Sequence, residues 1–314
     1  MAVLAVRIID GSPAVVDVAP PVGDGVRVRV TAAGICGSDL HLIDSGHAPT
    51  VTLGHEVSGL TDDGRRVAVE PILPCGTCDE CRSGAYHLCA IAPFTMLGIG
   101  NDGGMAGELV VPERCLVLLD PAVDPAEGFL VEPIAVAVHG LDLARWAPSM
   151  RTAVIGAGSI GCCAAATIVA LGGSVDVACR HDHQRAAIDA VGGGAEVTDG
   201  YDVVVETAGT ASALRAAARI VRPGGTLVLL SIHWDPTPGA GLPMWIKEVR
   251  VVHSMTYRGH AGHRDIDIAA GLLARSPRLG AAVITHRFPL EAAVEAFECA
   301  RDRRAGAIKV VLEP

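Results

Sequence analysis

Four cysteines lie within fifteen residues of this chain, in the segment CGTCDECRSGAYHLC. Their spacing is C-x2-C-x2-C-x7-C, and four thiolates on one short loop can close a tetrahedral shell around Zn²⁺. The ferredoxin run of an iron–sulfur protein spaces its cysteines differently, and crowded thiols without a metal would oxidise. The spacing therefore predicts a zinc ion that orders a lobe without reacting, held by Cys75, Cys78, Cys81 and Cys89.

Length and charge limit the remaining possibilities. The chain has 314 residues, and half of them are apolar. This length exceeds what one hydrophobic core usually organises, so two domains are expected. A net charge of -10 without a basic run argues against nucleic acid as a partner. Arg7 and Asp10 interrupt the apolar start before a signal peptide could form, and no uncharged run reaches the roughly 20 residues that span a bilayer. We expect a cytoplasmic protein without membrane partners.

The patterns of strands and helices divide the chain. Over residues 1–125, short runs such as VRVRVTAAG alternate with turn residues, as in an antiparallel, barrel-like unit. From about residue 150, strand-like runs alternate with Ala-rich helical stretches, the βαβ rhythm of a parallel doubly wound sheet. Residues 283–314 hold one helix and one strand, too little to stand alone. We predict an α/β protein with one domain over 1–125, completed by 283–314, and a second over 126–282.

Residues on both sides of the cysteine segment predict a second, open metal site. Cys36, His55 and a carboxylate from Glu56 or Glu132 would supply three ligands. Three protein ligands leave the fourth position open, which is the arrangement of a catalytic zinc. Each residue alone has an ordinary structural explanation, such as a buried thiol or a satisfied histidine, so the prediction depends on the combination.

The run TAVIGAGSIG predicts a phosphate loop. It places G-x-G-x-x-G between a strand and a helix, with Gly156, Gly158 and Gly161 at the glycine positions and Ser159 and Ile160 between them. Glycines there allow a tight turn, close approach of pyrophosphate to the backbone, and packing of the helix on the strand. Within the βαβ rhythm this motif indicates a dinucleotide cofactor.

The next strand indicates which dinucleotide. An NAD site has an acidic residue about 20 residues beyond the loop, where it binds the ribose hydroxyls. Here Cys179 takes that place, followed by Arg180, His181 and Arg185. Arginine in place of the acid favours a 2′-phosphate, so NADP(H) is predicted. The alternative is NAD(H), with Asp176 as the ribose-binding acid.

In this order, CGSDLH, LGHE, the four-cysteine segment, GGMAGELVVP and AVIGAGSIG resemble the zinc-dependent medium-chain dehydrogenase/reductase family over nearly the whole chain. The resemblance implies a GroES-like β-barrel catalytic domain followed by a Rossmann domain. It implies Cys36 and His55 as zinc ligands, with Glu56 and Glu132 competing for the remaining positions or sharing them through water. EPIAVAVHG resembles the polyol and threonine branch, and because adjacent residues of extended chain point opposite ways, we favour Glu132.

The resemblance also implies roles for residues near these ligands. Ser38 would pass the substrate hydroxyl proton toward the cofactor ribose, and His41 would carry it to water. Asp39 would orient a ligating imidazole. Lys309 matches a basic position that contacts cofactor phosphate in some relatives, with a surface lysine as the alternative.

We therefore predict an alcohol dehydrogenase with two zinc ions per chain that transfers hydride between NADP(H) and a secondary alcohol or ketone, such as a polyol, cyclitol, sugar or amino alcohol. The alternatives are a zinc-independent enoyl or quinone reductase, whose relatives lack both cysteine loop and ligand set, and an inactive zinc-stabilised binding protein. Because relatives pair their cofactor domains at a sheet edge, we expect a homodimer or homotetramer formed near residues 250–256.

Overall fold

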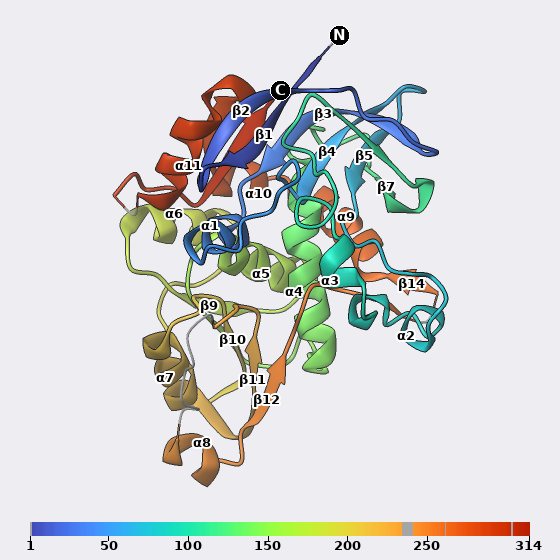
Figure 1. The fold of residues 1–314 in the computed structure, drawn as a ribbon. Helices are drawn as coiled ribbons and strands as arrows, with labels where there is room; N and C mark the ends of the chain where they lie inside the picture. Colours follow the sequence, from blue (N-terminus) through green and yellow to red (C-terminus); the bar gives the residue numbers. More distant parts are fainter. Residues whose placement is uncertain (1, 234–240, 261, 303) are drawn as a thin grey trace. The chain divides into compact units, whose positions relative to one another are not determined.

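The computed structural model describes residues 2–233, 241–260, 262–302 and 304–314, which form two compact units (Figure 1). Unit 1 contains Met1–Glu132, Arg258–Ala274 and Ile284–Pro314, and unit 2 contains Pro133–Tyr257 and Arg275–Val283. Residues 258–274 thus group with unit 1, whereas the sequence division placed them in 126–282. They do so because helix α9 (Asp265–Ala274) packs against strand β7 of unit 1 (Leu116–Leu118).

Unit 1 is built on a seven-stranded sheet in the order β15-β16-β3-β4-β5-β7, with β6 also pairing with β3. All pairings are antiparallel except that of β15 with β16, which confirms the predicted antiparallel unit. In β3 the apolar residues Val28 and Val30 are buried and face the core. The bounds of the strands are β3 (Val26–Gly34), β4 (Glu56–Thr61), β5 (Arg66–Val69), β6 (Glu108–Val111), β15 (Ile284–Pro289) and β16 (Lys309–Glu313).

Unit 1 also contains two hairpins and several short helices. Two hairpins pair β1 (Val3–Ile9) with β2 (Ser12–Val18) and β13 (Gly259–His260) with β14 (His263–Arg264). The helices are α1 (Gly37–Asp44), α2 (Asp79–Arg82), η1 (Tyr86–Leu88), α3 (Ala92–Thr95), η2 (Glu113–Cys115), η3 (Gly128–Leu130), η4 (Leu290–Ala292) and α11 (Ala293–Arg301). Helix α4 (Val131–Leu143) begins in unit 1 and continues into unit 2.

Unit 2 is a parallel five-stranded sheet in the order β12-β11-β10-β8-β9, with helices between successive strands. This confirms the predicted doubly wound sheet. All four residues of β8 are buried, as expected for a strand covered on both faces. The elements are β8 (Thr152–Ile155), α5 (Ser159–Ala170), β9 (Val175–Ala178), α6 (Asp182–Ala190), β10 (Tyr201–Glu206), α7 (Ala211–Ile220), β11 (Val221–Leu229), α8 (Leu242–Ile246), β12 (Arg250–His253) and α10 (Leu279–Val283).

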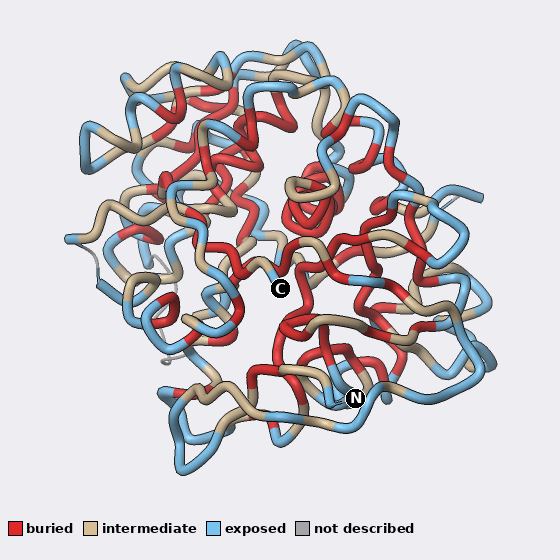
Figure 2. Tube along the Cα trace, turned by 90° about the horizontal axis from the view of Figure 1, so that it is seen from above, coloured by how far each residue is buried: buried red, intermediate tan, exposed pale blue. Residues whose placement is uncertain are grey.

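Burial follows the strands of each unit. In Figure 2 the buried positions gather along inner segments of the trace, and the exposed positions lie on outer turns. Each unit has its own apolar core: Val28, Leu53 and Phe297 belong to that of unit 1, and Val204 and Leu227 to that of unit 2. Polar groups buried within these cores therefore call for a specific explanation, because burial without a partner is costly.

Candidate functional site

The first predicted zinc ligand, Cys36, stands between strand β3 and helix α1. It has extended backbone angles and is the N-cap of α1. Its backbone N–H donates to Oδ2 of Asp39 at 2.9 Å, so the third residue of the helix closes the turn back onto its cap. The thiol is thereby held at a fixed point beside the helix.

His55 lies in the loop before β4 and is 4 % exposed. Its Nδ1 lies 3.4 Å from Oδ1 of Asp39, and its Nε2 lies 3.3 Å from Oγ of Ser38. Burial opposes a charged imidazole, but the side chains of Asp39 and Cys36 outweigh burial and raise the pKa of His55 well above its ordinary value. A zinc ligand is the neutral imidazole, so metal binding at His55 would release a proton.

Glu56 forms a buried ion pair that sequence reasoning missed. Both of its carboxylate oxygens accept hydrogen bonds from Nζ of Lys309, at 2.7 and 2.6 Å, and the same ammonium donates to the carbonyl oxygen of Ile35 at 3.1 Å. Glu56 is 0 % and Lys309 2 % exposed, so the alternative of a surface lysine is wrong. Gly34 makes room for the pair, since a Cβ there would lie 2.2 Å from Oε2 of Glu56. The available signal was a lysine inside the apolar run AIKVVL.

Glu132, at the start of α4, is also buried. Burial raises the pKa of its carboxyl to about 7, while the neighbouring His55 opposes that rise. Within the described part of the chain, no hydrogen bond or ion pair to the Glu132 carboxylate is found. A buried carboxylate without a hydrogen bond or ion pair is suited to binding a cation.

The residues present fit a zinc ion. Ligand atoms of Cys36, His55 and Glu56 all lie within 4.8 Å of one another, and a thiolate, an imidazole and a carboxylate are donors that zinc accepts. Nδ1 of His55 and Oδ1 of Asp39 are buried without a hydrogen bond of good geometry among the described residues. Glu132 is not in the 4.8 Å group, so the choice between the two glutamates stays a prediction.

The four cysteines of the opening segment also come together. Their sulfur atoms lie within 4.8 Å of one another, with Cys78 Sγ 3.4 Å from Cys81 Sγ. Backbone N–H groups of Thr77 and Cys78 donate to Cys75 Sγ at 3.4 and 3.3 Å, and the N–H of Cys75 donates to Cys89 Sγ at 3.4 Å. Mainly through the backbone N–H of Thr77, the pKa of Cys75 is lowered to about 6. This donor set fits the predicted zinc.

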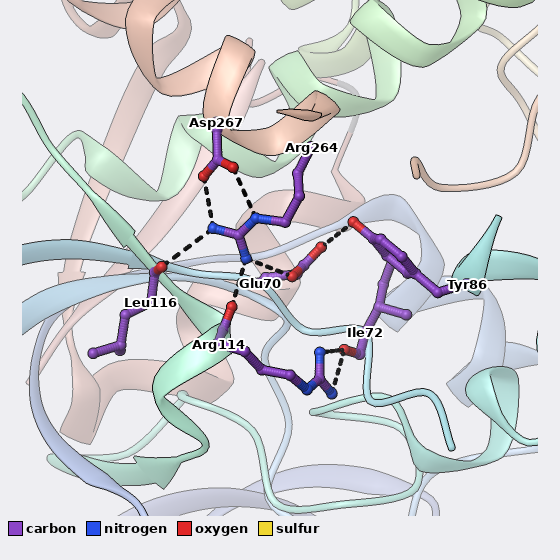
Figure 3. A network of polar contacts seen from close by, with 7 residues as sticks. All are labelled: Glu70, Ile72, Tyr86, Arg114, Leu116, Arg264 and Asp267. Atoms are coloured by element: carbon purple, nitrogen blue, oxygen red, sulfur yellow. Dashed lines mark hydrogen bonds and ion pairs between the residues drawn. The ribbon is translucent and has the colours of Figure 1, made fainter. Parts of the chain in front are cut away.

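A network around Glu70 joins this cysteine lobe to residues 258–274, and sequence reasoning missed it (Figure 3). Glu70 is 1 % exposed; its Oε1 accepts from Tyr86 Oη at 2.5 Å and its Oε2 from Arg264 Nη1 at 2.9 Å. Arg264 also donates to both carboxylate oxygens of Asp267, at 2.6 and 2.8 Å, and to carbonyl oxygens of residues 114 and 116. Burial raises the pKa of Glu70, while Tyr86 and Arg264 oppose the rise.

The predicted phosphate loop has the geometry that its glycines require. Gly156, between β8 and α5, has φ +111°. A Cβ at Gly161 would lie 1.8 Å from the carbonyl oxygen of Gly156, so no larger residue fits. Helix α5 begins at Ser159 with Gly158 as its N-cap, which leaves the backbone N–H groups of its first turn facing the loop. Such an end of a helix suits a phosphate.

The side chains in and beyond β9 bear on the choice between NADP(H) and NAD(H). Asp176 accepts a hydrogen bond from Tyr201 Oη at 2.7 Å, within the sheet. Arg180, His181 and Arg185 are exposed around the start of α6, where the Gln184 side chain accepts from the backbone N–H groups of residues 180 and 181. Arg185 lies 3.7 Å from Asp182, while for the guanidinium of Arg180 the described residues provide no ion pair.

Known proteins resemble this chain along its whole length. Family models match for the alcohol dehydrogenase GroES-like domain over residues 23–121 and for the zinc-binding dehydrogenase over residues 186–274. Galactitol 1-phosphate 5-dehydrogenase of Escherichia coli K12 is 30% identical over 93% of each chain. The 2-dehydro-3-deoxy-L-galactonate 5-dehydrogenase of Pseudoalteromonas atlantica is 30% identical over 82% of each chain. A zinc-binding dehydrogenase from Sinorhizobium meliloti 1021, whose crystal structure contains bound NADP, is 27% identical in sequence, with a TM-score of 0.87 over 100% of both chains.

Among the described residues, no helix is long and apolar enough to cross a membrane.

Proposed function

The chain belongs to the zinc-dependent medium-chain dehydrogenase/reductase family, and we propose that it oxidises a secondary alcohol within a polyol or sugar derivative. It is an NAD(P)-dependent zinc alcohol dehydrogenase, an oxidoreductase that acts on CH–OH. The observation that carries the proposal is the meeting of Cys36, His55 and Glu56 within 4.8 Å, beside the hydroxyl of Ser38. The relatives that act on galactitol 1-phosphate and a deoxygalactonate support the substrate class.

We assign Cys36, His55 and Glu132 as the protein ligands of the catalytic zinc. The reason for preferring Glu132 is that both oxygens of Glu56 are engaged by Lys309, whereas the Glu132 carboxylate has no such partner among the described residues. Glu56 would balance the lysine charge and remain close to the metal. With the four-cysteine lobe, the proposal gives two zinc ions per chain.

Residues of unit 1 would transfer the proton of the substrate hydroxyl. When bound, the zinc ion supplies Lewis-acid polarisation of the substrate oxygen and the nicotinamide supplies the hydride acceptor. Ser38, whose Oγ lies 3.3 Å from Nε2 of His55, would accept the substrate hydroxyl proton and release its own proton toward the cofactor ribose. The Nδ1–H of His41 donates to the carbonyl oxygen of Gly37 at 2.6 Å, and we propose that this imidazole carries the proton onward to water.

We propose NADP(H) as the preferred cofactor. The carboxylate of Asp176 is engaged by Tyr201, so it is not well placed to bind ribose hydroxyls. Arg180, exposed at the end of β9, offers a guanidinium to a 2′-phosphate. The NADP bound to the Sinorhizobium meliloti relative supports this preference. NAD(H) remains the second candidate, and an inactive binding protein is the candidate of another class.

A turnover assay tests these proposals together. Zinc-loaded protein is incubated with NADP⁺ or NAD⁺ and a panel of polyols, sugar phosphates, cyclitols and amino alcohols, and nicotinamide absorbance is followed. Turnover with NADP⁺ preferred is expected; preference for NAD⁺ would contradict the assignment of Arg180. Cys36→Ala should abolish turnover, while Cys299→Ala, a control thiol outside both metal sites, should retain it. Full turnover by Cys36→Ala would disprove the catalytic zinc site.

A further inference from the structure

A buried carboxylate at the carboxyl end of β10 has no role in the chemistry above. Glu206 is 0 % exposed and is the last residue of the strand. Its Oε1 accepts hydrogen bonds from the backbone N–H groups of Ala208 and Gly209, at 2.8 and 2.9 Å. Its Oε2 accepts from the hydroxyl of Ser231 and lies 3.1 Å from Nε2 of His233. Four polar groups thus compensate the burial of one carboxylate.

These contacts tie together two loops. Residues 207–209 follow β10, and residues 231–233 follow its neighbour β11. The first loop also contacts the phosphate loop, because Oγ1 of Thr207 donates to the carbonyl oxygen of Gly156 at 3.0 Å. A continuous set of hydrogen bonds therefore runs along the carboxyl edge of the sheet, from the phosphate loop after β8 to the loop after β11.

This edge is where a dinucleotide binds. In a doubly wound sheet the ligand crosses the carboxyl ends of the strands, with pyrophosphate at the glycine loop and the adenosine ribose at the following strand. Here β9 lies on one side of β8, and β10 and β11 lie on the other. The adenosine half belongs to the β9 side, so the nicotinamide half belongs to the side that Glu206 organises.

We propose that Glu206 is a positioning residue for the nicotinamide half of the cofactor, acting through Ser231 and His233. The inference rests on the proposed dinucleotide function. Its physical basis is that an anion shared by two loops fixes their separation, and the nicotinamide ring and its ribose would lie against those loops. The adenosine half would not depend on Glu206.

Comparison of a whole and a half cofactor tests the proposal. Dissociation constants for NADP⁺ and for 2′,5′-ADP, which lacks the nicotinamide half, are measured by calorimetry with wild type and Glu206→Gln. The amide loses one acceptor oxygen, so NADP⁺ should bind about tenfold more weakly, while 2′,5′-ADP should stay within about twofold. An equal loss for both ligands, or no loss for either, would overturn the proposal.

Asp202→Asn is the matched control. Asp202 lies near the other end of the same strand, where its carboxylate accepts hydrogen bonds from Arg222 Nε at 2.6 Å and from the backbone N–H of Arg151 at 2.8 Å. This variant should lower the melting temperature without changing the ratio of the two dissociation constants, and a changed ratio would overturn the proposal. If Glu206→Gln does not fold, Ser231→Ala, which removes one donor, replaces it under the same criteria.

The same measurement separates this inference from the cofactor proposal. If wild type binds NAD⁺ more tightly than NADP⁺, the choice of NADP(H) fails and the ratio is taken with NAD⁺ and AMP instead. If wild type binds none of these ligands, the dinucleotide function itself fails and this inference fails with it. If wild type binds normally and the ratio does not respond to Glu206→Gln, the inference alone fails.

Discussion

At the scale of single residues, the pairing of Glu56 with Lys309 has the largest consequences. A carboxylate and an ammonium at 0 % and 2 % exposure lose nearly all contact with water, so each depends on the other for compensation. The pair lies next to the proposed metal ligands, and Lys309 also holds the carbonyl of Ile35, the residue before Cys36. A substitution of Lys309 in β16 should therefore disturb the backbone at the start of α1.

Removing the lysine should be costly. We expect Lys309→Met to lower the free energy of unfolding by about 3 kcal/mol or more, because it leaves the Glu56 carboxylate buried without its partner. The double variant Glu56→Gln/Lys309→Met should lose less free energy of unfolding than the sum of the losses in the two single variants, as measured by urea unfolding. Strict additivity of the two single variants would contradict the pairing.

Two buried thiols should show a raised pKa. Burial raises the pKa of Cys115 to about 11 and that of Cys162 to about 12, against roughly 8.5 for an ordinary cysteine. Because the thiolate is the reactive form, the rate of alkylation by iodoacetamide follows the fraction of ionised thiol. In the folded protein this rate should still rise with pH above about 9.5, whereas in urea it should be half-maximal near pH 8.5 and level off about one pH unit higher. Rates are read by peptide mass spectrometry, and a half-maximal rate near pH 8.5 in the folded protein would contradict the prediction.

At the scale of elements, the Glu70 network explains why residues 258–274 pack with unit 1. Arg264 in the short strand β14 donates to Glu70, the residue directly after β5, and Tyr86 in η1 donates to the other carboxylate oxygen of Glu70. The backbone adds a further link, since the N–H of Gly259 donates to the carbonyl oxygen of Gly84 at 2.9 Å. The cysteine lobe is thus anchored on a segment far away in sequence.

Loss of Arg264 should loosen this anchor. We expect Arg264→Met to destabilise the protein by about 2 to 4 kcal/mol, since it leaves the Glu70 carboxylate buried without a charged partner. Hydrogen exchange of residues 258–267 should become faster. Arg82→Met, which removes an exposed ion pair with Asp79 in the same lobe, serves as the control and should leave the melting temperature unchanged. Equal effects of the two variants would contradict the anchoring role.

At the scale of the whole molecule, unit 2 has exposed apolar side chains on α8 and an edge strand, β12. Strand β12 ends the described sheet with β11 as its one strand partner, and Leu242, Trp245 and Ile246 of α8 are 64%, 78% and 64% exposed. Exposed apolar side chains together with a strand that has one unpaired edge suit a second copy of the same surface. We therefore propose that the expected homodimer or homotetramer forms through β12 and α8.

A single charge should disrupt this contact. We expect wild type to sediment as a dimer or larger homo-oligomer at micromolar concentration and Trp245→Asp to shift it toward monomer in analytical ultracentrifugation. Phe94→Asp replaces an equally exposed apolar residue, 77% exposed, in unit 1 and should leave the assembly intact. A monomeric wild type would disprove the proposal, and dissociation by Phe94→Asp alone would place the contact in unit 1.

Local patterns were enough to predict the fold classes of both units and the shape of the phosphate loop. Alternation in VRVRV, buried runs such as TAVI, and the glycines of GAGSIG each act over a few neighbouring residues, so the sequence carries them directly. The clustering of four cysteines is equally local. The order of the motifs also predicted that Cys36 and His55 lie together. It did not predict which glutamate binds the metal.

What the sequence alone determined is what short-range chemistry dictates: strands, helices, the thiol-rich lobe and the glycine turn. The tertiary structure decided the pairing of Glu56 with Lys309 across 253 residues, of Glu70 with Arg264 across 194, and of Glu206 with His233 across 27. Each is a buried carboxylate that must find a donor after the chain has folded. The sequence does not distinguish one carboxylate from another. The partner of each buried carboxylate depends on which donor groups the folded chain brings within hydrogen-bonding distance.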